Sequence, residues 1–406
     1  MKRRTFLLSS LALAAAPKPL LQRESFRHYV DQFNRDDQED VAGLIHNAGA
    51  WDWMCSNIPL FSCPDPDIER TYYYRWWAYR KHIERTPVGY VLTEFLKPVK
   101  HATTYNAISC AAGLHISEGR WLRDPSYLDD YIRFWLRGGE NGGLQPHFHQ
   151  FSGWIADAVY DRWLADGRTQ TMLGLLDALL TDYRTWEQEK QVPSGLFWQR
   201  DVSDGMESSI SGGRKVRNIR TSINSYMYGN ARAIAAIAGL AGNAKLQAEY
   251  EAKAAGLRRL VEERLWNSQA QFFETVLEDG ESANVRELIG YTPWYFELPE
   301  QGKGYEIAWK QLMDPKGFLA PYGPTTAEQR HPEFQIPYSG DDCQWNGPSW
   351  PFATSITLRA MANVLNDYPQ DAVTRQDYLR TLLIYTKSQR LKLEDVRVIP
   401  WIDEDL

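Results

Sequence analysis

Residues 152–166, SGWIADAVYDRWLAD, carry the pattern that decides the fold class. Their apolar residues recur every three or four positions, which places them on one face of an α-helix. No long run alternates apolar and polar residues, although residues 270–277 could form a short ribbon. The sequence therefore predicts an all-α protein. The helical period recurs in residues 67–85, 104–119, 125–137, 169–190, 223–241, 244–266, 303–313, 350–366 and 374–388.

Short connections between most of these helices predict successive helical hairpins. Hairpins of this length can close into a ring, the (α/α)6 toroid, whose site would lie at one end among the loops. Two longer connections, residues 191–221 and 314–349, are rich in residues typical of loops. Compact domains keep loops of this length mainly for function. We therefore expect these two loops to line the site.

The composition excludes some classes of function. The 406 residues are 43% hydrophobic and 24% charged, which is the balance of a globular protein. A net charge of −7 argues against a nucleic-acid partner, because binding the phosphate backbone requires a basic surface. The chain holds 16 Trp, 22 Tyr and 15 Phe. Most must fill the core, but Trp and Tyr also offer the flat apolar face and polar edge that suit a sugar ring.

The first 18 residues predict an export signal. Lys2, Arg3 and Arg4 precede an apolar run from Phe6 to about Ala16, which is too short to span a membrane. The adjacent arginines indicate the twin-arginine route. We expect an exported protein, periplasmic or secreted, without an integral membrane segment. Residues 19–406 would then form a single domain.

The cysteines and histidines give little support to a metal site. No two cysteines have the C-x-x-C spacing of a structural zinc site. In an exported protein Cys55 could pair with Cys63, whereas buried thiols are the default for Cys110 and Cys343. His147 and His149 have a spacing seen in metal ligands, but a loop pair that binds sugar or nothing is favoured. We expect neither a metal nor a cofactor.

Three polar motifs could carry chemistry. The first loop holds Asp201, Asp204 and Glu207, and a carboxyl group among aromatic residues can gain the raised pKa of a general acid. An acidic surface loop or a calcium-binding turn would have the same composition. The second loop ends in CQWNGPSWP, residues 343–351, where two Trp and two amides would suit a sugar or a packed junction. The chain ends in PWIDEDL, residues 400–406, which alone is an acidic tail.

Together these motifs resemble the (α/α)6 inverting glycosidases of glycoside hydrolase families 63 and 37, which include processing α-glucosidase, mannosylglycerate hydrolase and trehalase. GMESS, residues 205–209, is similar to the segment that holds their general acid, which implies Glu207 for this role with Asp204 as the fallback. QWNGPSWP, residues 344–351, resembles their tryptophan element and implies that Gln344, Trp345, Asn346 and Trp350 bind substrate. The family's late general base falls at Glu404.

The sequence departs from the family pattern in three places. Glu207 stands where the family usually has Asp, which lengthens the arm by one methylene. The segment YYYRWW, residues 72–77, lacks the Asp that trehalases carry there, which argues against trehalose. The chain also stops two residues after Glu404, where the family continues. It therefore resembles a C-terminally truncated toroid, and we expect an incomplete ring.

Several other side chains are candidates for binding substrate, each with a structural alternative. Arg75 and Trp76 lie in an aromatic helix that could reach a pocket or fill the core. Glu118 could bind a sugar hydroxyl or pair with an arginine. Trp154 and Asp157 share a helix face, Tyr322 lies in a Gly-rich stretch before the tryptophan motif, and Arg220 and Asn224 flank a helix start near the acidic loop.

Three hypotheses follow. The first is an exported inverting exo-α-glycosidase that acts on an oligosaccharide or glycoside, and the acidic chain with paired carboxylates favours it. The second is a helical-toroid polysaccharide lyase, in which Tyr226, Asn224 and His149 could serve. The third is a non-catalytic glycan-binding toroid. The sequence specifies neither the sugar nor the oligomeric state.

Overall fold

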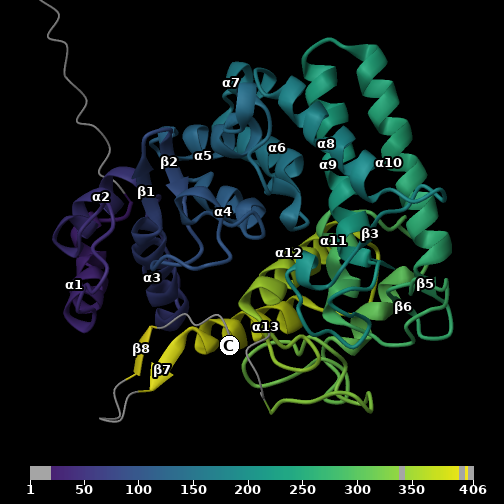
Figure 1. Ribbon diagram of the computed structural model, residues 1–406. Coiled ribbons are helices and arrows are strands. Elements are labelled where there is room, and N and C mark those ends of the chain that lie inside the picture. Colours follow the sequence, from purple (N-terminus) through teal and green to yellow (C-terminus); the bar gives the residue numbers. More distant parts are fainter. Residues whose placement is uncertain (1–19, 338–342, 393–397, 401–406) are drawn as a thin grey trace, which may run out of the picture.

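The structure is a computed structural model that describes residues 20–337, 343–392 and 398–400. It is mostly helical, as predicted (Figure 1). The α-helices are α1 (Arg27–Asp36), α2 (Ala50–Asn57), α3 (Pro66–Lys81), α4 (Ala112–Gly119), α5 (Ser126–Arg137), α6 (Ile155–Asp166), α7 (Thr169–Leu173), α8 (Leu176–Lys190), α9 (Thr221–Leu240), α10 (Ala244–Arg264), α11 (Thr292–Tyr295), α12 (Pro351–Asp367) and α13 (Arg375–Ser388).

The strands are short and pair only as antiparallel two-stranded ribbons in the described residues. The hairpin of β5 and β6 lies close to the ribbon expected near residues 270–277. The pairs are β1 (Ile83–Thr86) with β2 (Gly89–Leu92), β3 (Trp198–Gln199) with β4 (Asn218–Ile219), β5 (Trp266–Asn267) with β6 (Phe272–Phe273), and β7 (Arg390–Lys392) with β8 (Val398–Pro400).

The helices close into a ring. Going round it, α4 packs on α6, α6 on α9, α9 on α11, α11 on α12, α12 on α13, and α13 on α3. The Arg75–Glu118 ion pair, 2.7 Å long, joins α3 to α4. Figure 1 shows the yellow helix α13 beside the dark blue helix α3, so helices from the two halves of the described chain meet on one side of the ring. This architecture is the predicted (α/α)6 toroid. The expectation of an incomplete ring was wrong, because α13 packs on α3 and closes the ring within the described residues.

Other helices cover the outside of the ring. Helices α8 and α10 pack on α9, whereas α1 and α2 pack on α3. Most aromatic side chains fill the core between these layers, as expected from their number. The largest fully buried side chains include Trp135, Trp154, Trp294 and Trp309. A search of the described helices found none with the length and apolar character to cross a bilayer.

Three predicted helices were partly wrong. Residues 104–111 do not join α4, because Tyr105 and Asn106 adopt positive φ angles that a helix excludes. The helix expected over 169–190 is divided at Gly174 into α7 and α8. The segment 303–313 forms a 3₁₀ helix, Tyr305–Gln311, that follows a left-handed Gly304. The helical period did not reveal α1, α2 or the single turn of α11.

Candidate active site

The loop of residues 201–209 lies where several ring helices begin. Ser203 accepts a hydrogen bond of 2.9 Å from the backbone N–H of Ser152, just before α6. The carboxylate of Asp204 pairs with Arg220, the residue that directly precedes α9. We call residues 201–209 the acid loop, after its carboxylates.

The same loop contacts the entries to α12 and α4. Ser208 donates to the carbonyl of Cys343 at 3.1 Å and accepts from the N–H of Trp345 at 3.0 Å, ahead of α12. Gly205 has a φ of +79°, and a Cβ there would lie 2.8 Å from the sulfur of Cys110, just before α4. The two motifs singled out in the sequence thus meet at the end of the ring where these helices start.

Glu207 is held at the surface of the acid loop. Its Oε2 accepts from Arg214 at 3.1 Å and from the backbone N–H of Cys343 at 3.0 Å. Its side chain is 27% exposed. Among the described residues, no hydrogen bond reaches Oε1.

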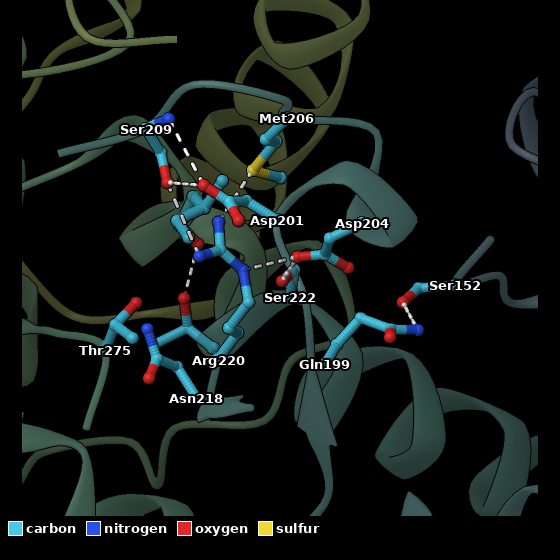
Figure 2. A network of polar contacts seen from close by, with 12 residues as sticks. Ser152, Gln199, Asp201, Asp204, Met206, Ser209, Asn218, Arg220, Ser222 and Thr275 are labelled. Carbon is cyan, nitrogen blue, oxygen red and sulfur yellow. Dashed lines mark hydrogen bonds and ion pairs between the residues drawn. The ribbon is translucent and has the colours of Figure 1, made fainter. Parts of the chain in front are cut away.

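Asp204 is buried, and its carboxylate points toward Arg220 and Ser222 (Figure 2). Its side chain and that of Arg220 are completely buried, with Nε and Oδ2 3.0 Å apart. Ser222 also donates to Oδ2, whereas Oδ1 is buried without a hydrogen-bond partner among the described residues. The fallback role of Asp204 as general acid is not supported, because a substrate cannot reach it in this position.

Asp201 closes the acid loop on itself. Its Oδ1 accepts from the N–H of Gly213 at 2.8 Å, and its Oδ2 accepts from the hydroxyl of Ser209 at 3.2 Å. Asp201 is buried, so these bonds are shielded from water. The loop is therefore an ordered structure and not a solvated acidic turn.

The tryptophan motif packs beside the acid loop. The rings of Trp345 and Trp350 stack with centroids 5.4 Å apart and planes at 9°. Both rings are buried, so they help to stabilise the fold in addition to any contact with substrate. Three polar atoms of the motif are buried without a hydrogen-bond partner in the described part of the chain: Gln344 Oε1, Trp345 Nε1 and Asn346 Oδ1. Such groups are uncommon in proteins and mark places where a ligand or water can bind.

A cavity of about 410 Å³ lies among α3, α4, α12 and α13. Its wall includes Ser355 and Arg359 of α12, the helix that begins directly after the tryptophan motif. Tyr72 and Tyr385 give it aromatic surface, and both Arg75 and Glu118 line it, as predicted. The cavity therefore lies inside the ring, with α12 connecting it to the motif.

A network of charges surrounds the cavity. Asp161 of α6 binds Arg120 at 3.2 Å and Arg359 at 2.5 Å. The guanidinium of Arg359 also stacks 4.2 Å from the ring centre of Tyr295. One turn along α6, burial and the charge of Asp161 raise the pKa of Asp157 to about 7, and its Oδ2 is buried without a hydrogen-bond partner among the described residues. The charges give the cavity both donors and acceptors.

The remaining predicted residues are distributed between the core and the surface. Trp76 is buried in the aromatic core, and Trp154 packs between Tyr226 and Tyr295. Asn224 is fully buried. Its side-chain amide accepts a hydrogen bond from the backbone N–H of Phe197 and donates one to the carbonyl of the same residue, so its polar groups are used in the fold. Tyr322 is 65% exposed. Glu404 lies outside the described residues.

The His-x-His spacing does not form a metal site in the described chain. His149 bonds Asp182 at 2.8 Å and Glu189 at 3.0 Å, and it stacks on Trp186. No group of three or more potential ligands was found among the described residues. All four cysteines are described and none forms a disulfide, so the suggested Cys55–Cys63 bond is absent.

Sequence reasoning missed the charged residues beside the cavity, above all Arg359. A signal was available, because Arg359 is the only charged residue between Pro351 and Leu365, a segment otherwise rich in apolar and small residues. A lone charge in such a helix indicates a buried partner or a ligand.

The comparisons with known proteins agree with this geometry. The model of the mannosylglycerate hydrolase MGH1-like glycoside hydrolase domain matches residues 104–404. The chain belongs to this family. The resemblance read from the sequence motifs is thereby confirmed at the level of the family, and the match ends at the position of Glu404.

Solved structures place the MGH1-like domain among related toroids. A protein described as a sialidase is 50% identical over 95% of this chain, with a TM-score of 0.91, but the chain spans only 35% of that protein. The family 63 mannosylglycerate hydrolase of Thermus thermophilus, in complex with glucose, has a TM-score of 0.54 at 14% identity. That match covers 72% of this chain and 85% of the hydrolase.

A rhamnosidase from Klebsiella oxytoca has a TM-score of 0.55 at 9% identity, covering 81% of this chain and 56% of the rhamnosidase. At the low identities of the hydrolase and the rhamnosidase, these two matches establish the (α/α)6 fold and nothing finer.

Proposed function

We propose that this protein is an exported glycoside hydrolase that cleaves an oligosaccharide or glycoside, most simply an α-linked one, with inversion at the anomeric carbon. One observation carries the proposal. Glu207 is bonded to the backbone of Cys343, which joins the acid loop to the tryptophan motif beside the start of α12. The residues of the N-terminal segment, 1–18, support export.

Glu207 is the proposed general acid. Its Oε1, to which no described residue donates, would carry a proton to the glycosidic oxygen, while Arg214 and the N–H of Cys343 hold Oε2. The bond from that oxygen to the anomeric carbon then breaks as the proton arrives. The added methylene of Glu, relative to Asp, gives the carboxyl group longer reach from a loop anchored at both ends.

Glu404 is the proposed general base. Pro400 of β8 lies opposite Arg390 in the β7–β8 ribbon, next to Gln389, which lines the cavity. Three residues separate Pro400 from Glu404, and the four steps along the chain between them span at most about 14 Å. In this role the carboxylate of Glu404 would take a proton from a water that attacks the anomeric carbon from the face opposite the leaving group.

The cavity is the proposed site of the sugar. Arg75, Glu118 and Arg359 supply charged hydrogen-bond donors and acceptors for hydroxyl groups. Tyr72 and Tyr385 offer apolar faces for the ring carbons. This mixture favours a neutral or weakly charged sugar.

Kinetics with two kinds of leaving group test the proposal. Alkyl α-glycosides and the matching glycosyl fluorides would be assayed with Glu207→Gln, Glu404→Gln and, as control, Glu249→Gln on the exposed surface of α10. Glu207→Gln should slow alkyl glycosides about 100- to 10,000-fold and spare the fluorides, because fluoride leaves without a proton. Glu404→Gln should slow both, and Glu249→Gln neither.

The stereochemistry of the product tests inversion. Proton NMR of the first product should show the anomer opposite to that of the substrate. Retention, or full activity of Glu207→Gln on alkyl glycosides, would contradict the mechanism. A product that absorbs in the ultraviolet would indicate a lyase, and binding without turnover would indicate the glycan-binding alternative. Sialosides belong in the screen because of the name of the 50% identical protein.

A further inference from the structure

Arg220 contacts the acid loop on both sides of Glu207. On one side its Nε pairs with Asp204 at 3.0 Å. One terminal nitrogen lies 3.2 Å from the sulfur of Met206 on this same side, and the second lies 3.5 Å from the hydroxyl of Ser209 on the other side. Figure 2 shows the guanidinium in the centre of these groups.

The partners of Arg220 are fixed in turn. Ser222, in the first turn of α9, donates to Asp204, and Asp201 bonds Ser209. Because Arg220 directly precedes α9, its own backbone is anchored by a long buried helix. The guanidinium therefore transmits the position of α9 to the acid loop.

We propose that Arg220 is a positioning residue that sets the place of the Glu207 carboxyl group. This inference rests on the proposed role of Glu207 and adds a second residue to it. Arg220 is completely buried, so it acts through the loop without touching the substrate.

The planar fork of an arginine is needed for this arrangement. Its three nitrogens face Asp204, Met206 and Ser209 at the same time. A lysine carries one compact ammonium and would keep the charge while losing this geometry. A displacement of about 1 Å at a reacting group can cost about 100-fold in rate. The conservative lysine should therefore fail to restore activity.

The experiment compares Arg220→Lys and Arg220→Met with Glu207→Gln on the two leaving groups. We expect kcat for alkyl glycosides to fall about 100-fold in both arginine variants, while KM and the rate with glycosyl fluorides change little. A merely structural defect would lower both rates together through loss of folded protein. Circular dichroism and a thermal melt would report the folded fraction.

Two further variants keep the test decisive. Arg162→Met removes another buried arginine, which pairs with Asp129 away from the acid loop and should lower stability without any preference for a leaving group. Asp204→Asn keeps the shape of the carboxylate and weakens its bond to Arg220. Asp204→Asn should also lower kcat for alkyl glycosides and spare the fluorides. If the arginine variants do not fold, this variant tests the positioning role.

The outcomes separate this inference from the proposed function. If Glu207→Gln spares fluorides but the Arg220 and Asp204 variants lose both substrates equally, the positioning role is wrong and the general acid stands. If Glu207→Gln itself shows no dependence on the leaving group, both assignments fall. If the Glu207, Arg220 and Asp204 variants all lose activity on alkyl glycosides but keep it on fluorides, both the general acid and the positioning residue are supported.

Discussion

At the scale of single residues, the ring interior contains a carboxyl group whose protonation should control stability. Burial and the neighbouring Asp161 raise the pKa of Asp157 to about 7, although Arg359 and Arg232 oppose this. In the unfolded chain an aspartate titrates near pH 4. Native Asp157 therefore holds a proton between about pH 4 and 7 that the unfolded chain has released.

This difference predicts the sign of a pH effect. The protein loses up to about 1.4 kcal/mol of stability from this group for each pH unit between about 4 and 7, because the unfolded chain ionises more easily. Asp157→Asn cannot ionise, so its stability relative to the native protein should be higher at pH 8 than at pH 5. Urea unfolding at both values measures this, with the exposed Asp371→Asn as control. An advantage equal at both pH values would contradict the prediction.

At the scale of elements, α13 is the helix that completes the ring and supplies Tyr385 to the cavity. Its start is defined by a capping box. The hydroxyl of Thr374 accepts from the N–H of Asp377 at 3.2 Å, and the carboxylate of Asp377 accepts from the N–H of Thr374 at 2.9 Å. These bonds satisfy two groups that the first helical turn leaves without partners.

Loss of this cap should weaken the whole domain modestly. Thr374→Ala should cost about 1 kcal/mol in the free energy of unfolding, which is the usual value for an N-cap. Thr181→Ala is the matched control, because that exposed threonine lies within α8 and bonds only the preceding turn. Chemical denaturation compares the two variants, and equal effects would mean that the cap adds nothing.

At the scale of the whole molecule, Arg359 connects several helices of the ring. From α12 it pairs with Asp161 of α6 and donates at 3.0 Å to the hydroxyl of Tyr295 in α11. Removing Arg359 would leave Asp161 with Arg120 as its arginine partner and would take a donor from the hydroxyl of Tyr295. This network holds helices that are far apart in sequence around one cavity.

Removing the guanidinium should therefore destabilise the ring. Arg359→Met keeps much of the apolar stem and should cost about 2 kcal/mol, less than the value for a fully buried pair because Arg359 is partly exposed. Arg259→Met breaks an exposed ion pair on α10 and should change stability by less than about 1 kcal/mol. Urea unfolding of both variants checks this. Similar losses in the free energy of unfolding would mean that the network around Arg359 adds no more stability than an exposed ion pair.

The sequence by itself determined the helical class, the toroid and the two motifs of the family. The reason is local, because the helical period depends on neighbouring residues and a motif is read within a few positions. The family comparison and the ring of helices confirm these predictions. The roles assigned to Glu207 and Glu404 remain predictions.

Only the tertiary structure decided which side chains meet. Asp204 and Glu207 are three residues apart and look alike in the sequence, yet one is sealed against Arg220 and the other is open at the surface. Trp154 and Asn224 were expected at the site and lie in the core. Arg359, which lines the cavity, and its partner Asp161 were not expected. Burial and charge pairing depend on contacts between helices that are far apart in the sequence. A local sequence pattern does not show which of these helices will pack together.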